Sequence, residues 1–238
     1  MSNLPTPPKA FIFDVFGTVV DWRLSVARFA SEVLVNKQIE IDGLVFADFW
    51  RGQYQPAMAR IRSGNRGYVP LDELHFENLE STLEHFSLSS ALSDAEKWHL
   101  NTAWERLDPW PDVVAGLAQL KKSAIIAPCS NGSIALMTRL ARYGGLPWDC
   151  ILGADIAQNY KPEHTVYLAC CSALRLRPDQ VAMVAAHNDD LEAAREAGLK
   201  TAFIPRPTEH GGSQEKDLEA SHDWDWIIKD FAELSQMD

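Results

Sequence analysis

The chain has 238 residues, of which 46% are hydrophobic and 23% are charged, a composition typical of a globular protein rather than of a disordered one. Its formal net charge of −11 argues against a general nucleic-acid or membrane-surface binder, because both polyanions would repel the chain. The length suits one large α/β domain, or a core domain with a smaller insertion.

The N-terminus and the cysteines indicate where the protein acts. Residues 1–8 contain neither a basic nor an apolar stretch, so we expect a frayed, proline-rich tail rather than a signal peptide. No stretch of the sequence is long and apolar enough for a membrane span. Because the cysteines form no CxxC pair and no Cys/His metal-ligand spacing, we expect reduced, mostly buried thiols at Cys129, Cys150, Cys170 and Cys171. These features predict a cytoplasmic protein.

The first predicted element is a strand over residues 10–13, whose unbroken apolar run is typical of a strand buried on both faces. It ends at Asp14, and a turn containing Gly17 and Thr18 follows. A charge at the end of a buried strand is costly unless it has partners or a function. Asp14 could form only a local bond to its own backbone. Alternatively, it could lie in the crevice at the carboxyl end of a parallel sheet, where open α/β folds bind ligands.

Residues 24 to about 108 show only helical periodicity. The predicted helices cover residues 24–38, 44–63, 71–86 and 93–107. Ser93, followed by Glu96, resembles a capping box that opens the last of these helices. The clearest loop in the block is at residues 63–67. Because the block has no strand of its own, we expect an all-helical cap domain over residues 22–108, inserted after the first strand.

Strands and helices alternate again from Pro109 onward. The predicted strands cover residues 123–129, 150–153, 181–186 and 201–204, and the predicted helices cover residues 111–122, 133–143, 163–173 and 191–197. Such alternation indicates right-handed βαβ units. The predicted fold class is therefore α/β, with a Rossmann-like parallel sheet flanked by helices as a core domain over residues 9–21 and 109–238. We expect a loop over residues 206–222 and a terminal helix over residues 223–234.

Polar residues occur at or soon after the end of each of the first four predicted core strands. They are Asp14, Ser130-Asn131-Gly132, Lys161 in the loop after the third strand, and His187-Asn188-Asp189-Asp190. Because the carboxyl ends of parallel strands meet at one edge of the sheet, we expect these side chains to converge there. A carboxylate nucleophile, a hydroxyl with amide donors, a cation and a second acid would then share one site.

The order of these residues resembles the four sequence motifs of the haloacid dehalogenase superfamily. The corresponding stretches are Asp14-x-Phe16-Gly17-Thr18, Ser130-Asn131-Gly132, Lys161-Pro162, and Asp190 before Ala193-Ala194-x-x-Ala197-Gly198. The resemblance covers residues 11 to about 207, and the helical insertion is similar to that superfamily's cap. Four motifs in order are a far more specific signal than any one of them, and they imply a core of that superfamily's type.

Most members of this superfamily are magnesium-dependent phosphatases, from which the sequence departs at two positions. Phosphatases carry a general-acid Asp two residues after the nucleophile, where this chain has Phe16, and a metal-ligating Asp four residues before the last acid, where it has Ala186. A phenyl ring cannot protonate a leaving alkoxide, and two apolar positions remove much of the oxygen ligation that Mg²⁺ needs. The resemblance therefore points to the L-2-haloacid dehalogenase branch, the type II (S)-2-haloacid dehalogenases, with no metal and no cofactor.

Other residues are similar to that branch, with one departure. Lys161-Pro162 is followed by Tyr167, as in the branch's third motif, and Trp50-Arg51 resembles its halide-directed arginine. Members often have Ser-Ser-Asn before the last acid, whereas this chain has Ala185-Ala186-His187. The departure concerns the groups that hold the hydrolytic water.

The resemblance implies a hydrolase that converts (S)-2-haloalkanoic acids, or haloacetates, to 2-hydroxy acids and halide. Asp14, whose unperturbed pKa of about 3.9 leaves it ionised at neutral pH, attacks C2 and forms an ester. Water then attacks the ester carbonyl, and the configuration at C2 ends inverted. Lys161 holds Asp14 charged and oriented, and Asp190 with His187 orients or deprotonates the water. Thr18 completes the predicted catalytic set.

The predicted substrate-binding residues are Arg51, Ser130, Asn131, Phe16, Tyr167 and Val15. Thr18, Ser130 and Asn131 carry hydroxyl and amide groups that can bind the substrate carboxylate. Arg51 is assigned to the departing halide, where a fixed cation stabilises the charge that develops. Arg23 is its rival for that role, or for the substrate carboxylate. The aromatic side chains that could line the pocket, or simply pack in the core, are Tyr54, Tyr68 and Trp110.

Two other functions remain open at this point. One is a phosphatase of the same superfamily acting on a small phosphate ester, and the other is a catalytically silent relative that keeps the fold for binding. With haloacid hydrolysis as the leading hypothesis, the expected partners are a small halogenated carboxylate and halide, with no nucleic acid and no membrane. The family resemblance also suggests a homodimer.

Overall fold

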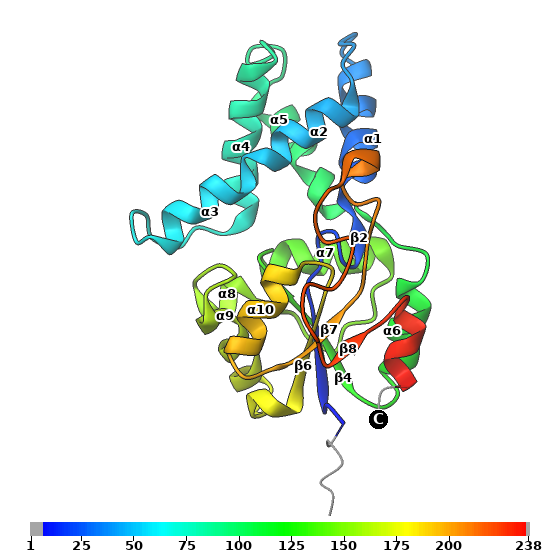
Figure 1. Ribbon diagram of the computed structural model, residues 1–238. Helices are drawn as coiled ribbons and strands as arrows, with labels where there is room; N and C mark the ends of the chain where they lie inside the picture. Colours follow the sequence, from blue (N-terminus) through cyan, green and yellow to red (C-terminus); the bar gives the residue numbers. More distant parts are fainter. Residues whose placement is uncertain (1–6, 237–238) are drawn as a thin grey trace, which may run out of the picture.

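The core of the molecule is a parallel sheet of six strands (Figure 1). The computed structural model describes residues 7–236. The strand order across the sheet is β5-β4-β1-β6-β7-β8, and neighbouring strands run parallel. The strands are β1 (Ala10–Phe13), β4 (Ile125–Ser130), β5 (Leu152–Gly153), β6 (Val181–Ala185), β7 (Lys200–Phe203) and β8 (Trp226–Ile227). The predicted α/β fold class is confirmed.

Strand β1 lies inside the sheet, between β4 and β6. All four of its residues are buried, which explains why the sequence there is an unbroken apolar run. Its side chains alternate between the two faces, so that Phe13 packs in one apolar cluster and Ile12 in the other. The backbone N–H of Asp14 donates to the carbonyl of Val184 at 3.0 Å. The sheet therefore fixes Asp14 at its carboxyl edge.

Helices cover both faces of the sheet (Figure 1). They are α6 (Val113–Leu120), α7 (Ile134–Gly144), α8 (Ala154–Ala157), α9 (His164–Ala173) and α10 (Asn188–Glu196), with a 3₁₀ helix, η2 (Pro178–Gln180), before β6. Buried side chains of α6 and α7 join the cluster around Phe13, and those of α9 and α10 join the cluster around Ile12. The four predicted core helices are found, with ends that differ by a few residues, whereas α8 has no predicted counterpart.

The chain between residues 22 and 105 forms a second, helical layer beyond the carboxyl edge of the sheet (Figure 1). Its elements are α1 (Trp22–Val35), α2 (Gly43–Gly52), α3 (Tyr54–Arg62), α4 (Leu71–His85), α5 (Asp94–Asn101) and the 3₁₀ helix η1 (Thr102–Glu105). Where the chain enters and leaves this layer, β2 (Val20–Asp21) pairs antiparallel with β3 (Asp108–Pro109). The division of the chain into two domains at these points stays a prediction.

One predicted helix of this layer is wrong and one predicted cap is confirmed. Instead of a single helix over residues 44–63, the chain turns at Gln53, between α2 and α3. Pro56 has no N–H to donate to the carbonyl four residues before it, so it interrupts one helix but is tolerated in the first turn of the next. At the start of α5, the Ser93 hydroxyl accepts from the N–H of Glu96, whose carboxylate accepts from the N–H of Ser93.

The C-terminal segment also differs from the prediction. Instead of a terminal helix over residues 223–234, the chain forms β8, beside β7, and then the 3₁₀ helix η4 (Phe231–Gln236). Asp225 accepts from the N–H and the hydroxyl of Thr201 in β7, at 2.8 and 2.9 Å. Pairing with the sheet thus outweighs the local helical pattern.

The remaining expectations concern the loop after β7, the cysteines and the N-terminus. Residues 206–222 form a loop with one 3₁₀ turn, η3 (Gly211–Ser213). The four cysteines carry free thiols, three of them buried. Residues 1–6, where the proline-rich tail is expected, lie outside the described residues. Within residues 7–236, no helix is long and apolar enough to cross a membrane.

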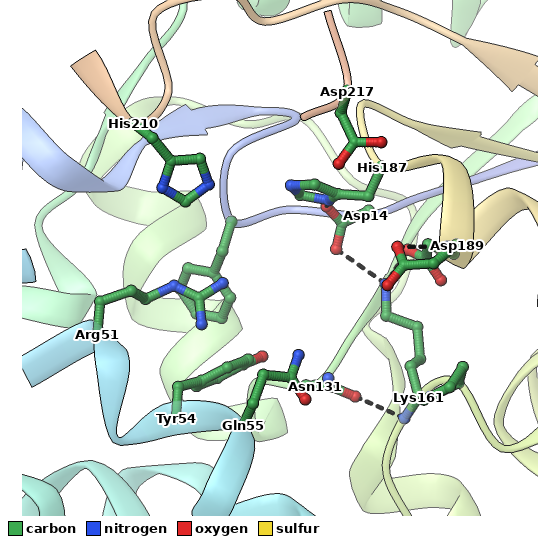
Figure 2. Close-up of a pocket in the computed structure, with 13 residues that line it drawn as sticks. Asp14, Arg51, Tyr54, Gln55, Asn131, Lys161, His187, Asp189, His210 and Asp217 are labelled. Atoms are coloured by element: carbon green, nitrogen blue, oxygen red, sulfur yellow. Dashed lines mark hydrogen bonds and ion pairs between the residues drawn. The ribbon is translucent and has the colours of Figure 1, made fainter. Parts of the chain in front are cut away.

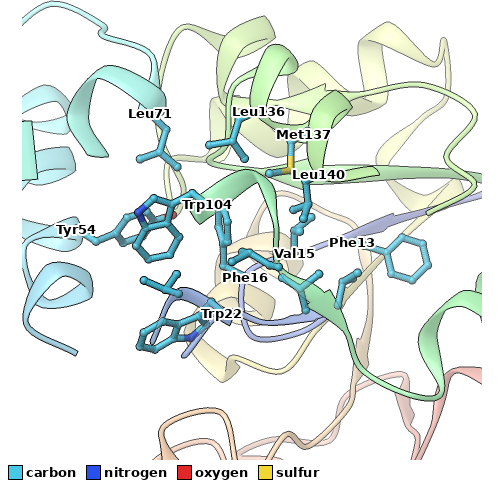
Figure 3. Close-up of a cluster of buried hydrophobic side chains, with 14 of the residues drawn as sticks. Phe13, Val15, Phe16, Trp22, Tyr54, Leu71, Trp104, Leu136, Met137 and Leu140 are labelled. Atoms are coloured by element: carbon cyan, nitrogen blue, oxygen red, sulfur yellow. The ribbon is translucent and has the colours of Figure 1, made fainter. Parts of the chain in front are cut away.

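An aromatic cluster joins the helical layer to the edge of the sheet (Figure 3). The Phe16 ring makes edge contacts with Trp104 and Tyr54, at centroid distances of 5.9 and 6.4 Å. Each such pair contributes about 0.5–1.5 kcal/mol beyond its buried area. Val15 is fully buried in the same cluster. These contacts hold the two layers together directly beside Asp14.

Candidate active site

A cavity of about 180 Å³ lies between the carboxyl edge of the sheet and the helical layer (Figure 2). Pockets for drug-sized ligands occupy about 300–1,000 Å³, so this cavity suits a smaller molecule. Most of its wall is polar or charged. The lining residues are Asp14, Phe16, Arg51, Tyr54, Gln55, Asn131, Lys161, Pro162, His187, Asp189, Asp190, His210 and Asp217.

The carboxylate of Asp14 is held by three neighbouring groups. Its Oδ1 accepts from Nζ of Lys161 at 2.8 Å, and its Oδ2 accepts from the Thr18 hydroxyl at 2.7 Å. Nδ1 of His187 lies 3.1 Å from the same Oδ2. Burial raises the pKa of Asp14, but the charges and hydrogen bonds of Lys161 and His187 outweigh burial and hold the pKa below its usual value. Asp14 is therefore an ionised, oriented carboxylate that is only 7% exposed.

Lys161 lies between two carboxylates. Its Nζ contacts Oδ2 of Asp190 at 2.5 Å as well as Asp14. Burial lowers the pKa of Lys161, but the two anions outweigh it, and the pKa lies well above its usual value. The backbone is fixed too, because the N–H of Lys161 donates to Oδ1 of Asn131 at 2.8 Å and its carbonyl accepts from Arg62.

Asp190 has both carboxylate oxygens engaged. Lys161 donates to Oδ2, and the hydroxyl of Tyr167 donates to Oδ1 at 2.5 Å. Tyr167 is fully buried and does not line the cavity, and its assignment to the substrate stays a prediction. It lies on α9, behind the acid, where its hydroxyl finds the partner that a buried polar group needs.

His187 connects Asp14 to a carboxylate that the sequence did not reveal. Its Nε2 lies 2.9 Å from Oε2 of Glu209, in the loop after β7. Burial lowers the pKa of His187, but Glu209 and Asp14 outweigh burial and raise it well above the usual value. Conversely, burial raises the pKa of Glu209, and the His187 charge brings it below the usual value. His187 and Glu209 thus form a partly buried ion pair.

Glu209 is absent from the predicted site because no local pattern marks it. It lies within a polar loop outside the four motifs, and only the fold brings it to His187. The same loop supplies His210 and Asp217 to the cavity wall, and these two residues were also missed. A polar loop next to the carboxyl edge of the sheet is the only hint that the sequence offers.

Arg51 is the cation on the other side of the cavity from Lys161 (Figure 2). Its guanidinium lies 3.9 Å from the centroid of the Tyr54 ring, and its buried Nε has no hydrogen-bond partner among residues 7–236. The rival Arg23 instead makes two hydrogen bonds of 2.7 Å to Asp48. Arg51 is therefore the better placed of the two to receive an anion.

The predicted carboxylate-binding groups divide into one that lines the cavity and two that do not. Asn131 lines it, and because its Oδ1 accepts from the backbone, its Nδ2 is the group left to donate. Ser130 is fully buried and its hydroxyl accepts from the N–H of Gly132 at 3.0 Å, so it shapes the turn instead. Thr18 donates to Asp14 and accepts from the N–H of Ala186 at 2.9 Å, so it supports the nucleophile.

The other apolar and aromatic candidates are placed as follows. Val15 is fully buried in the same interior cluster as Phe16 but, unlike Phe16, does not line the cavity. Phe16 and Tyr54 do line the cavity. Tyr68 donates to Asp155, and Trp110 donates to the carbonyl of Gly17, both away from the lining.

The donor set does not fit a magnesium site. Ala186 stands where the superfamily's phosphatases carry a metal-ligating Asp, and it has no side-chain oxygen. Within residues 7–236, no group of three or more His, Cys, Asp and Glu side chains is arranged to hold a metal ion. What the site offers chemically is an ionised carboxylate, two fixed cations and a histidine.

Known proteins resemble the chain over most of its length. Residues 8–198 match the family described as haloacid dehalogenase-like hydrolases. The (S)-2-haloacid dehalogenase 1 of Pseudomonas sp. (strain CBS-3) is 30% identical over 203 residues, which cover 84% of this chain and 86% of that protein. A solved defluorinating L-2-haloacid dehalogenase has a TM-score of 0.95 and 43% identity, covering 98% of both chains. A second L-2-haloacid dehalogenase has a TM-score of 0.93 and 45% identity, covering 96% of this chain and 97% of its own.

Proposed function

The chain belongs to the haloacid dehalogenase-like hydrolases, and from this premise we propose that it is a 2-haloacid dehalogenase, a hydrolase acting on carbon–halogen bonds. Its substrates are (S)-2-haloalkanoic acids or haloacetates, and its products are 2-hydroxy acids and halide. One observation carries the proposal above the others. The ionised Asp14 faces a small cavity with Arg51 across from it, while Phe16 occupies the position of a phosphatase's general acid.

The first step is displacement of halide by Asp14. The carboxylate attacks C2 from the side opposite the halogen, a C–O bond forms, and the carbon–halogen bond breaks with its electron pair going to the halide. Arg51 stabilises the departing anion, whose charge develops in the transition state. Lys161 and Thr18 hold Asp14 in one orientation, which removes much of the entropic cost of bringing the reactants together.

The second step is hydrolysis of the ester at Asp14. Water attacks the ester carbonyl and needs a base. Asp190 already accepts from Lys161 and Tyr167, so it acts by positioning Lys161. His187 contacts the Asp14 carboxylate and borders the cavity, so we assign the proton transfer to His187. This assignment narrows the sequence-based expectation, in which Asp190 and His187 shared the role.

Two assays separate this function from its alternatives. Chloride release from L-2-chloropropionate is measured in EDTA, and hydrolysis of an aryl phosphate is measured with Mg²⁺. We expect halide release without metal and no phosphate release. Metal-dependent phosphate release without halide release would overturn the proposal in favour of a phosphatase, and the absence of both activities would favour a binding protein.

Isotope labelling tests the covalent route itself. In one turnover in heavy-oxygen water, the ester mechanism places the label in the Asp14 carboxylate, because water attacks the carboxyl carbon rather than C2. Peptide mass spectrometry locates the label. Label found only in the 2-hydroxy acid would instead indicate direct attack of water on C2.

A further inference from the structure

Glu209 has the environment of a functional carboxylate rather than of a loop residue. It is only 2% exposed, although the loop around it is largely open to solvent. Its Oε1 accepts from Nε1 of Trp22 at 2.9 Å, and its Oε2 lies 2.9 Å from Nε2 of His187. The Trp22 contact ties Glu209 to the start of the helical layer, so both oxygens are held in place.

The loop of the nucleophile is shaped around this carboxylate. Gly17 has a φ of +92°, and a Cβ added there would lie 2.1 Å from Oε1 of Glu209. Any side chain at position 17 would therefore displace Glu209. The absence of a Cβ lets the carboxylate pack against the backbone three residues after Asp14.

We propose that Glu209 is a positioning residue for hydrolysis of the ester, because it orients His187 and makes Nδ1 the basic atom. The inference rests on the proposed function. A neutral histidine carries one ring proton, and the hydrogen bond at one nitrogen determines which nitrogen keeps it. Because Glu209 accepts at Nε2, the proton stays on Nε2. The lone pair of Nδ1 then points toward Asp14, where the water attacks.

The two carboxylates give His187 different protonation states during the cycle. In the free enzyme the imidazole contacts Asp14 and Glu209 together, and because these two carboxylates raise its pKa, we take it as an imidazolium that donates to both. Ester formation removes the charge of Asp14, so His187 releases its Nδ1 proton to solvent through the cavity, where 20% of its side chain is exposed. That proton is the one the overall reaction must release, since haloacid and water give hydroxy acid, halide and H⁺.

In the hydrolysis step that follows, Nδ1 of His187 takes part in every proton transfer. The water oxygen bonds to Cγ of Asp14 while one water proton moves to Nδ1 of His187. The bond between Cγ and the oxygen of the 2-hydroxy acid breaks, and the leaving oxygen takes the proton from Nδ1. The carboxylic acid left at Asp14 returns its proton to Nδ1, which restores the carboxylate and the imidazolium. Glu209 keeps its charge throughout.

The test compares the two steps in Glu209→Gln. Rapid-quench measurements give halide release in the first turnover, and intact-protein mass spectrometry gives the amount of ester. We expect halide release within about threefold of wild type and ester hydrolysis slower by about 10²-fold or more, the usual scale for losing general-base catalysis. The ester therefore accumulates. Glu215→Gln, in an exposed part of the same loop, is the matched control and should behave as wild type.

Two results would overturn the inference. One is ester hydrolysis at the wild-type rate in Glu209→Gln. The other is an equal loss in both steps with no accumulated ester, which a merely structural role produces. Failure of the proposed function is distinguishable, because the wild type itself would then release no halide and form no ester.

A measurement on the wild type covers the case in which Glu209→Gln does not fold. Stopped-flow with a pH indicator follows proton release during the first turnover. We expect about one proton per site to appear with the halide, before the hydroxy acid forms. Proton release that coincides with hydroxy-acid formation would contradict the assignment of the resting imidazolium.

Discussion

The ammonium group of Lys161 lies 2.8 Å from Oδ1 of Asp14, and both residues are buried. The two residues are 147 positions apart in the sequence, one just after β1 and the other in the loop between α8 and α9. This pair keeps the nucleophile ionised inside the protein.

Lys161→Met should abolish most activity and destabilise the fold. The substitution leaves Asp14 and Asp190 without the cation between them, and breaking one side of a buried ion pair typically costs about 3–5 kcal/mol. We expect kcat to fall by at least about 10²-fold, because Asp14 loses a group that keeps it charged and oriented. Urea unfolding and steady-state kinetics measure the two effects. Adding Asp190→Asn to Lys161→Met should recover part of the stability but not the activity. A Lys161→Met variant as stable as wild type would show that Lys161 does not stabilise the two buried carboxylates.

Arg51→Met should slow formation of the ester specifically. Removing one preorganised group that stabilises developing charge costs about 10²–10³-fold in rate. Halide release in the first turnover should therefore fall by that factor, whereas hydrolysis of any ester formed should be nearly unchanged. Arg23→Met is the matched control, because Arg23 is already paired with Asp48 and should cost little activity. The opposite pattern would assign the halide to Arg23.

Most of the site was predictable because its residues follow strands. Asp14, Asn131 and His187 each lie just beyond the end of a buried strand, so the parallel order of strands brings them to one edge whatever the details of packing. Glu209 could not be predicted in this way, since it enters the site through a loop whose path depends on contacts with Trp22 and His187.

The errors in secondary structure have a similar origin. The helical periodicity continues through Gln53, although Pro56 ends one helix and begins another there. The sequence predicts a terminal helix over residues 223–234, but hydrogen bonds from Thr201 to Asp225 hold that segment against the sheet. Local periodicity cannot report such long-range contacts.

Stability should depend on pH through His187. Burial lowers the pKa of His187 in the folded protein, but Glu209 and Asp14 raise it by more, so the net shift is upward. A group of this kind stabilises the fold fully below its unfolded pKa of about 6.5, and the stabilisation is lost as pH rises through the folded pKa. The difference in unfolding free energy between wild type and His187→Asn should thus be largest near pH 6 and shrink above it. Urea unfolding across this range measures it, and a difference that grows with pH would have the wrong sign.

Gly17→Ala should destabilise the protein in a way that depends on Glu209. A Cβ at position 17 meets Oε1 of Glu209 at 2.1 Å, and the φ of +92° adds strain of about 1–2 kcal/mol for any L-residue. In a Glu209→Ala background the contact disappears and only the backbone strain remains. A double-mutant cycle from urea unfolding should therefore give a coupling of about 0.5–3 kcal/mol, the range for residues in contact. Additive effects would show that the two residues do not touch in solution.

Phe16→Asp should not convert the enzyme into a phosphatase. Phe16 is 4% exposed and packs against Trp104 and Tyr54, so the substitution opens a cavity and places a carboxylate among aromatic rings. Loss of the ring alone typically costs about 3–5 kcal/mol, and an unpaired buried charge adds to that cost. Phe16→Leu keeps the site apolar and should cost less.

Restoring an acid at position 16 also leaves Ala186 without an oxygen to offer a metal. Urea unfolding and aryl-phosphate hydrolysis with Mg²⁺ should therefore show a destabilised, inactive Phe16→Asp variant. If Phe16→Asp combined with Ala186→Asp were folded and hydrolysed phosphate only with Mg²⁺, the two positions together would decide the chemistry. Phosphate release by Phe16→Asp alone would show instead that the general acid is the one missing part.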